Sequence, residues 1–166
     1  MSRVKPTIKE RILARIKAAR RRNVFMRQDF DDMGSYNLIG NTLKQLLNEK
    51  KLVRVGYGLY TLARINQFNG RVIPDVKGGF PQIAREALNR LEVDWLVSDA
   101  VFDYMADKTT QIPAKLQLFV NKRFSRKITY KNYTVAFIPL KHTILKQKAD
   151  QRSGSRSSES INGKLG

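Results

Sequence analysis

The stretch DFDDMGSYNLIGNTLKQLLNEKKLVRVGYGLYTL, from Asp29 to Leu62, decides how the N-terminal part of this chain folds. Its pattern predicts a short helix, a tight turn, a second helix and a two-stranded hairpin. At the turn, we expect Gly34 to end the first helix in the left-handed conformation and Ser35 to cap the second through its hydroxyl. Two helices joined in this way are typical of a helix-turn-helix.

The second helix carries apolar residues at i, i+4, i+7 and i+8, which predicts one buried stripe formed by Ile39, Leu43, Leu46 and Leu47. Its opposite face is polar and consists of Asn37, Asn41, Lys44, Gln45 and Asn48. Asn and Gln can pair with adenine in the major groove, and Lys can reach guanine or phosphate. Any surface helix also has a polar outer face, so this pattern alone leaves both interpretations open.

The absence of acidic residues from this helix favours a nucleic-acid partner over an ordinary surface face. From Ser35 onward the first carboxylate is Glu49, although the helix dipole usually favours acids in the first turn. A helix N-terminus that approaches phosphates would exclude them.

The runs Leu52–Val55 and Leu59–Leu62 predict the hairpin, joined by Gly56-Tyr57-Gly58 with glycines at positions of positive φ. Arg54 and Tyr57 would then lie beside the outer face of the helix, although an ordinary hairpin with a solvated arginine also fits these two residues. Together with the helices, the hairpin predicts a winged helix-turn-helix. The candidate DNA-binding residues are Arg27, Ser35, Tyr36, Asn37, Asn41, Lys44, Gln45, Arg54 and Tyr57.

The 166 residues carry a net charge of +18, from 32 Lys and Arg against 14 Asp and Glu, and contain 42% hydrophobic residues. This excess of positive charge implies a polyanionic partner, most simply nucleic acid. Cysteine is absent, which excludes disulfides, thiolate zinc sites and a cysteine nucleophile. We find no signal peptide and no run of ~20 apolar residues, so we expect no membrane association and a cytoplasmic location, with the nucleus as the alternative.

Before the opening stretch, Thr7 and Glu10 form the pattern of a capping box for a helix that we expect to reach about Arg20. Residues 23–25 predict a short strand that could pair with the hairpin. The first helix of the motif is expected over residues 27–33, with a weak cap at Met26.

This order of elements resembles the N-terminal domain of the AbiEi-type antitoxins of bacterial type IV toxin-antitoxin systems, in particular a short stand-alone branch. The likeness covers roughly Thr7 to Ile138 and is carried by IKERILARIK at residues 8–17, VF-x3-DF at 24–30, G-x-GLY in the hairpin and QIPAK at 111–115. The resemblance implies a protein that represses its own promoter and counters a nucleotidyltransferase-like toxin.

The predicted fold class is α+β, with a winged helix-turn-helix at residues 1–64, a connector at 65–80, a small α+β domain with an antiparallel sheet at 81–145 and a flexible basic tail at 146–166. In the second domain we expect helices from Pro81 to Leu91 and from Ser98 to about Asp107. Strands are expected over residues 95–97, 116–120, 126–130 and 133–138, with a two-residue hairpin at Lys131-Asn132.

Residues 114–149 contain no carboxylate. A solvated face is one interpretation of this run, and a surface for nucleic acid or for an acidic partner protein is the other. The cations that could converge on the predicted sheet are Lys115, Lys122, Arg123, Arg126, Lys127 and Lys131.

We expect no enzyme, no cofactor and no metal site. The only histidine, His142, lies among apolar and basic residues. A nuclease built on Pro74-Asp75 would need a further acid and a lysine on an adjacent strand, and the three C-terminal strands carry no acid. Three hypotheses remain: an autorepressor that is also an antitoxin, a plain regulator whose basic C-terminal domain extends DNA binding, and a nuclease. Double-stranded DNA, with an operator that could be an inverted repeat, is the partner that the first two share.

Overall fold

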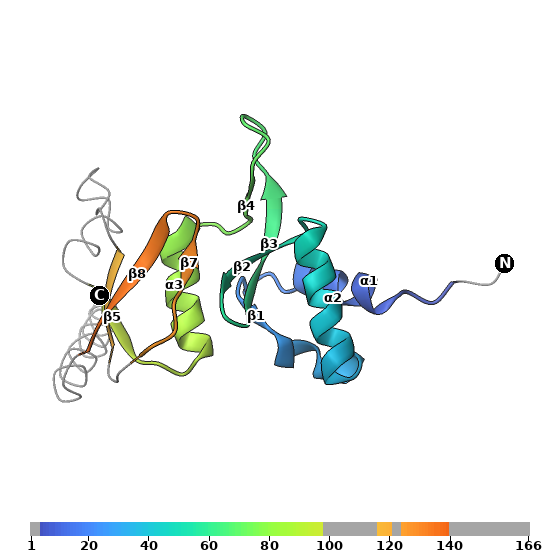
Figure 1. The fold of residues 1–166 in the computed structure, drawn as a ribbon, viewed down its shortest axis with the longest axis horizontal. Helices are drawn as coiled ribbons and strands as arrows, with labels where there is room; N and C mark the ends of the chain where they lie inside the picture. The colour runs from blue at the N-terminus through green and yellow to red at the C-terminus, as the bar shows by residue number, and fades with distance from the viewer. Residues whose placement is uncertain (1–3, 98–115, 121–123, 140–166) are drawn as a thin grey trace, which may run out of the picture. The chain divides into compact units, whose positions relative to one another are not determined.

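The computed structural model describes residues 4–97, 116–120 and 124–139, and mixes helices with strands (Figure 1). Its contacts divide the chain into two compact units, of which unit 1 is residues 1–91 with 126–134 and unit 2 is residues 92–125 with 135–166. The predicted α+β class is confirmed. This division differs from the expected domain boundary at residues 65–80. Residues 81–91 and 126–134, which were expected in the second domain, belong to unit 1.

Helix α1 spans Ile8–Ala18 and begins with the predicted capping box. The Thr7 N–H donates to Glu10 Oε2 at 2.7 Å, and the Glu10 N–H donates to Thr7 Oγ1 at 3.2 Å. Each side chain therefore satisfies a backbone donor that the first turn leaves open. The helix ends at Ala18, slightly earlier than the expected Arg20.

The second helical segment, η1 over Arg27–Met33, has the predicted bounds and is a 3-10 helix. Its weak cap is compensated from within, because Asp29 Oδ2 accepts from the Met26 N–H at 2.7 Å. Phe30 and Met33 are buried.

The expected left-handed conformation at Gly34 is wrong. Its φ of 168° and ψ of −175° are extended, because the chain leaves η1 straight and passes directly into the extended cap residue Ser35. The absence of a side chain still matters there, since a Cβ on Gly34 would lie 3.2 Å from Leu38 Cδ2.

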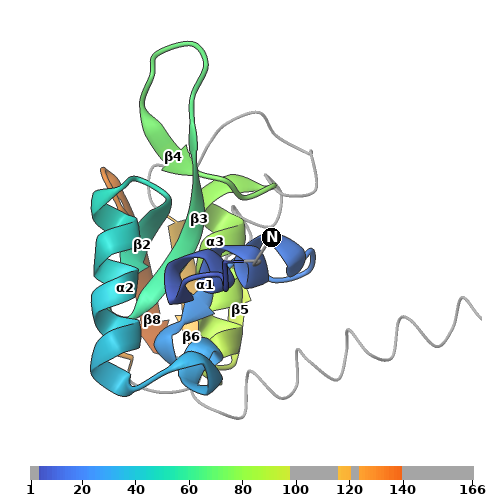
Figure 2. The same ribbon diagram turned by 90° about the vertical axis from the view of Figure 1, so that its right-hand side faces the viewer.

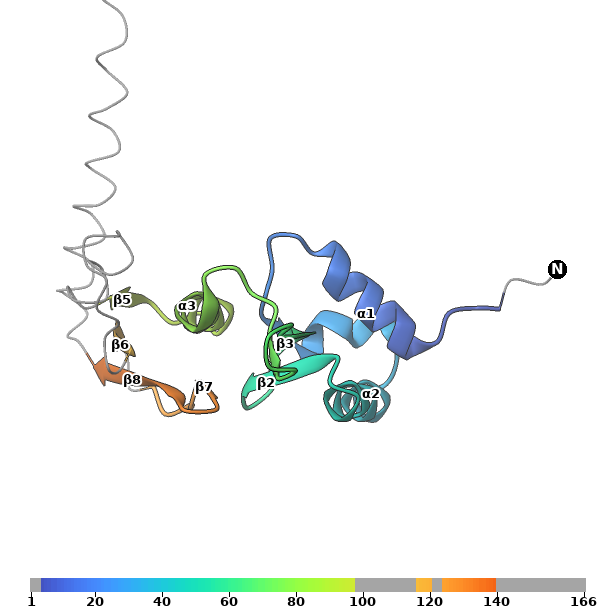
Figure 3. The same cartoon turned by 90° about the horizontal axis from the view of Figure 1, so that it is seen from above.

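Helix α2 spans Tyr36–Asn48, and Ser35 Oγ accepts from the Leu38 N–H at 3.4 Å, which confirms the predicted cap. Ile39, Leu43 and Leu46 are fully buried, and Leu47 packs at the edge of the same core. This core also takes in Ile12 of α1 and Leu52 of the hairpin. Figure 3 shows α1, η1 and α2 on the same side of the hairpin.

The hairpin consists of β2 (Leu52–Gly56) and β3 (Leu59–Ile65), which pair antiparallel. Strand β1 (Phe25–Met26) pairs with the start of β3, as the sequence suggested. A further strand, β4 (Val72–Pro74), pairs with the end of β3 inside the expected connector. The β3–β4 hairpin extends beyond the other elements of unit 1 (Figure 1).

Helix α3 spans Gly79–Arg90, close to the expected bounds of Pro81 and Leu91, and buries Ile83, Ala84, Ala87 and Leu88. In unit 1 the β2–β3 hairpin lies between this helix and the α1–α2 pair, as two perpendicular views show (Figures 1 and 3).

Unit 1 is completed by a segment from much later in the chain. Strand β7 (Thr129–Tyr130) pairs with the start of β8 (Tyr133–Pro139) across the predicted Lys131-Asn132 turn. The preceding Ile128 is fully buried and bridges to Gly56 of β2. The backbones approach so closely that a Cβ on Gly56 would meet Lys127 O at 2.9 Å.

Unit 2 contains β5 (Trp95–Val97), β6 (Leu116–Val120) and the rest of β8. The predicted antiparallel pairing is confirmed for β5 with β6, whereas β6 and β8 run parallel. A parallel pair needs a crossover of about a dozen residues or more, which residues 121–132 provide. The helix expected from Ser98 and the tail expected at 146–166 lie outside the described residues.

The contact at Gly56 yields a prediction. Gly56→Ala should lower the free energy of unfolding by about 1–3 kcal/mol, because the new methyl group meets backbone that cannot rotate away. Gly40→Ala is the matched control, since a Cβ there meets nothing within 4 Å, and it should stabilise the interior of α2 by about 1 kcal/mol. Urea unfolding of both variants measures the difference, and equal effects would contradict the close approach.

Candidate nucleic-acid interface

The outer face of α2 is polar and open to solvent. Its five predicted polar residues are all exposed, and the first turn of the helix contains no acidic residue. Within the described part of the chain, Asn37 and Asn41 make no side-chain hydrogen bond, so their amide groups are available to an outside partner. The predicted residues therefore all lie on α2, which runs along one side of the β2–β3 hairpin (Figure 2).

Gln45 is the exception on this face. Its Nε2 donates to Glu49 Oε1 at 3.0 Å, and Lys9 Nζ lies 2.7 Å from the same oxygen. The Lys9 hydrogen bond, with a smaller contribution from Gln45, lowers the pKa of Glu49. The carboxylate that ends the acid-free stretch is therefore neutralised from α1, and Gln45 would have to leave it to reach a base.

Arg27 and Tyr36 form a stacked pair where η1 leads into α2. The Arg27 guanidinium lies 3.4 Å from the centre of the Tyr36 ring and also pairs with Asp31 at 3.5 Å. Tyr36 remains 67% exposed, so the flat guanidinium is held against a ring that solvent still reaches. Ser35, also predicted as a DNA contact, uses its hydroxyl as the helix cap instead.

Arg54 and Tyr57 lie together at the end of the β2–β3 hairpin. The Arg54 guanidinium is 5.5 Å from the Tyr57 ring centre, and its Nε donates to Gly56 O at 3.2 Å. Tyr57 is 75% exposed. Gly58 has the expected positive φ of 69°, whereas Gly56 instead serves the close approach of Lys127.

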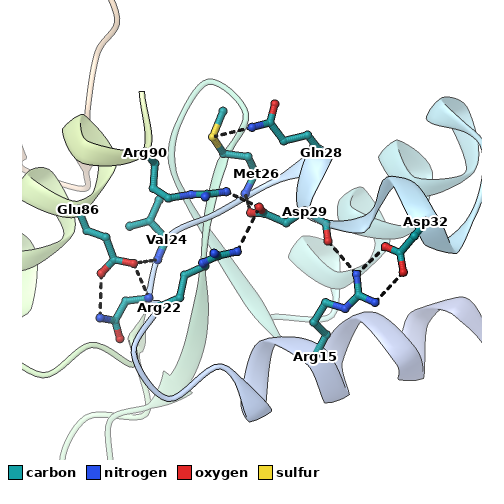
Figure 4. A network of polar contacts seen from close by, with 10 residues as sticks. Arg15, Arg22, Val24, Met26, Gln28, Asp29, Asp32, Glu86 and Arg90 are labelled. Atoms are coloured by element: carbon teal, nitrogen blue, oxygen red, sulfur yellow. Dashed lines mark hydrogen bonds and ion pairs between the residues drawn. The ribbon is translucent and has the colours of Figure 1, made fainter. Parts of the chain in front are cut away.

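Several arginines of unit 1 pair with carboxylates of the same unit (Figure 4). Arg15 forms a two-pronged pair with Asp32 at 2.6 and 2.7 Å, and its hydrogen bond lowers the pKa of Asp32. Asp29 pairs with Arg90 of α3 and, at 3.3 Å, with Arg22. These cations are structural and are not part of the candidate interface.

Glu86 of α3 is a second carboxylate with a structural role. It accepts from the backbone N–H groups of Asn23 and Val24 at 2.6 and 2.8 Å, and from Asn23 Nδ2 at 2.9 Å (Figure 4). Sequence reasoning missed both Asp29 and Glu86. The sequence offered one signal for their structural role. With 14 acidic residues against 32 Lys and Arg, each carboxylate has many potential hydrogen-bond donors around it.

The predicted basic patch of the C-terminal part is only partly described. Arg126, Lys127 and Lys131 are exposed. They lie just before β7 or in the β7–β8 turn, at one end of a sheet of order β5-β6-β8-β7, as expected, although residues 126–134 also contact β2 and belong to unit 1. Lys115, Lys122 and Arg123 lie outside the described residues.

The described part of the chain contains no group of three or more His, Asp or Glu side chains that could hold a metal ion. Asp75, the acid of the considered nuclease motif, pairs with Arg64 at 3.5 Å, and His142 lies outside the described residues. No helix in the described part has the length and apolar character to cross a membrane.

A family model described as "Family of unknown function (DUF6088)" matches residues 11–147, which include elements of both units. The comparisons with curated proteins and with solved structures gave no match.

The ion-pair network predicts unequal effects of two neighbouring acids. Asp29→Asn should lower the free energy of unfolding by about 3 kcal/mol, because it removes the counter-charge of the largely buried Arg90. Asp31→Asn should cost under about 1 kcal/mol, since its pair with Arg27 is exposed. Chemical denaturation of the two variants distinguishes them, and a similar small loss for both would show that Asp29 does not hold α3.

Proposed function

The chain belongs to the family of unknown function DUF6088, and we propose that it is a sequence-specific DNA-binding regulator acting in the cytoplasm. In this proposal, η1 and α2 form a helix-turn-helix, β2 and β3 form its wing, and the operator is double-stranded DNA. An operator built as an inverted repeat would suit two copies of the chain.

The acid-free outer face of α2 carries the proposal. Its first turn holds Asn37, its next turns hold Asn41 and Lys44, and all three are exposed. An N-terminus without acids presents its free N–H groups and positive dipole end to phosphates. Exposed amides next to it suit the donor and acceptor pattern of adenine in the major groove.

The wing supplies the second part of the argument. Arg54 and Tyr57 occupy the end of the β2–β3 hairpin and are both exposed, and Arg54 forms no ion pair with any described residue. Such a cation suits the sugar-phosphate backbone beside the groove. The stacked Arg27 and Tyr36 would face the backbone at the other end of α2.

Base-contacting and backbone-contacting residues should respond differently to substitution. Asn41→Ala should weaken binding to the promoter of the chain's own gene by about 1–3 kcal/mol and relax base preference, whereas Arg54→Ala should weaken promoter and random duplex alike. Fluorescence anisotropy with both duplexes measures this.

Asn48→Ala is a control that removes an exposed amide from the same helix at a position outside the candidate DNA contacts, and it should leave base preference unchanged. Wild-type affinity and base preference in Asn41→Ala would show that α2 does not read the operator.

We further propose that the regulator acts as the antitoxin of a nucleotidyltransferase-like toxin encoded next to it. This proposal rests mainly on the resemblance to AbiEi-type antitoxins. The structure adds that Arg126 and Lys127 are exposed and form no ion pair within the described part of the chain, so they could meet an acidic surface or compete for an anionic substrate. The alternative is a plain regulator without a toxin.

Coexpression with the neighbouring gene's product tests this role. The full chain should restore growth, and direct neutralisation predicts that the two proteins co-purify. If the exposed cations contribute, Arg126→Gln/Lys127→Gln should reduce the rescue by roughly an order of magnitude while Lys17→Gln/Arg20→Gln, on and after α1, should not. Absence of rescue by the wild-type chain would leave the plain regulator as the better account.

A further inference from the structure

Unit 1 contains an open hollow of about 720 Å³ along β2 that the proposed base contacts do not use. Its cationic lining residues are Lys50, Arg54, Arg71 and Lys131, and no carboxylate lines it. Apolar side chains, among them Leu52 and Val72, complete the surface between the cations.

The four cations come from four separate parts of the sequence: the turn after α2, strand β2, the residue before β4 and the β7–β8 turn. All four are exposed, and none forms an ion pair with a described residue. Arg15, Arg22 and Arg90, by contrast, are each matched with a carboxylate. Four unmatched cations around one hollow repel one another, and this repulsion is relieved when an anion binds between them.

Local backbone structure fixes where these side chains start. Lys50 and Lys131 have positive φ angles of 57° and 52° in the turns that carry them. The Arg71 N–H donates to Asn69 Oδ1 at 3.0 Å, and Arg71 O accepts from the Asn66 N–H at 2.8 Å. Three of the cations therefore start from hydrogen-bonded or left-handed turn positions, and Arg54 starts from strand β2.

Residues 130 and 131, of strand β7 and the turn after it, are hydrogen-bonded to β4 at the rim of the hollow. The Tyr130 hydroxyl donates to Val72 O, and Lys131 Nζ donates to the same carbonyl at 3.3 Å. Lys131 also lies 5.2 Å from the Tyr130 ring centre. Lys131 therefore reaches β4 from a position more than fifty residues away in the sequence.

We propose that this hollow binds the sugar-phosphate backbone of the same DNA duplex whose bases α2 contacts, and this proposal rests on the proposed function. The hollow begins where α2 ends, at Leu47 and Lys50, so a duplex lying along α2 would continue past it. Because the hollow is open to solvent and not enclosed, a long, rod-like polyanion can lie across it. Point cations and guanidinium groups without base-reading amides bind phosphate without regard to sequence.

The test uses the full chain with Arg71→Gln/Lys131→Gln. If each cation meets one phosphate, the slope of log K against log salt should become shallower by about 1.8, from roughly 0.9 per contact. The difference in affinity between about 50 and 200 mM salt should therefore shrink by about tenfold. Promoter and random duplex should be affected equally, with base preference unchanged.

Lys17→Gln/Arg20→Gln removes the same charge from and just after α1, away from the hollow, and should leave the slope within about half a contact of the wild type. A second variant, Lys50→Gln/Arg71→Gln, repeats the measurement without altering residues 126–134. Thermal unfolding verifies that each variant keeps its fold.

The outcomes separate this proposal from the proposed function. Wild-type slope in both hollow variants, with the wild-type chain still preferring its promoter, would overturn the phosphate site and leave the DNA-binding function intact. An equal loss of slope in the α1 control would also overturn it, because only net charge would then matter. A wild-type chain that binds neither duplex would overturn both.

Discussion

The carboxylate of Asp29 is the interaction on which unit 1 depends. One side chain caps the start of η1 through the Met26 N–H and pairs with Arg22 and with Arg90 of α3. The Asp29 carbonyl also accepts from Arg15 of α1 at 2.9 Å. A single residue therefore connects α1, η1 and α3, while Glu86 joins α3 to the residues that lead into β1.

Elements with strong local signals could be predicted from the sequence. The Thr7–Glu10 capping box, the stripe of α2 and strand β6 follow from residue types at fixed spacings, and the structure agrees with them. Gly34 misled because a glycine before a cap can be required by a near neighbour, here Leu38, as well as by a left-handed φ. Glycine alone does not distinguish these causes.

What could not be predicted depends on contacts between distant residues. The return of residues 126–134 to β2 and the parallel pairing of β6 with β8 leave no periodicity in the sequence. The exposed residues of α2 and the Ser35 cap were correctly predicted from the sequence pattern, but the hydrogen bond between Gln45 and Glu49 appears only in three dimensions. The sequence therefore predicted which residues lie on the exposed face of α2, but not which of their side chains are already hydrogen-bonded within the protein.

The discontinuity of unit 1 has a consequence for how the protein is made. A ribosome releases residues in chain order, so α1, α2 and the hairpin emerge long before Ile128 can bridge to Gly56. Until residues 126–134 are synthesised, one side of β2 lacks its last partner. Unit 1 is therefore complete only after residues 92–125, about half of unit 2, have also been translated, and a chain truncated before residue 126 would lack the last partner of β2.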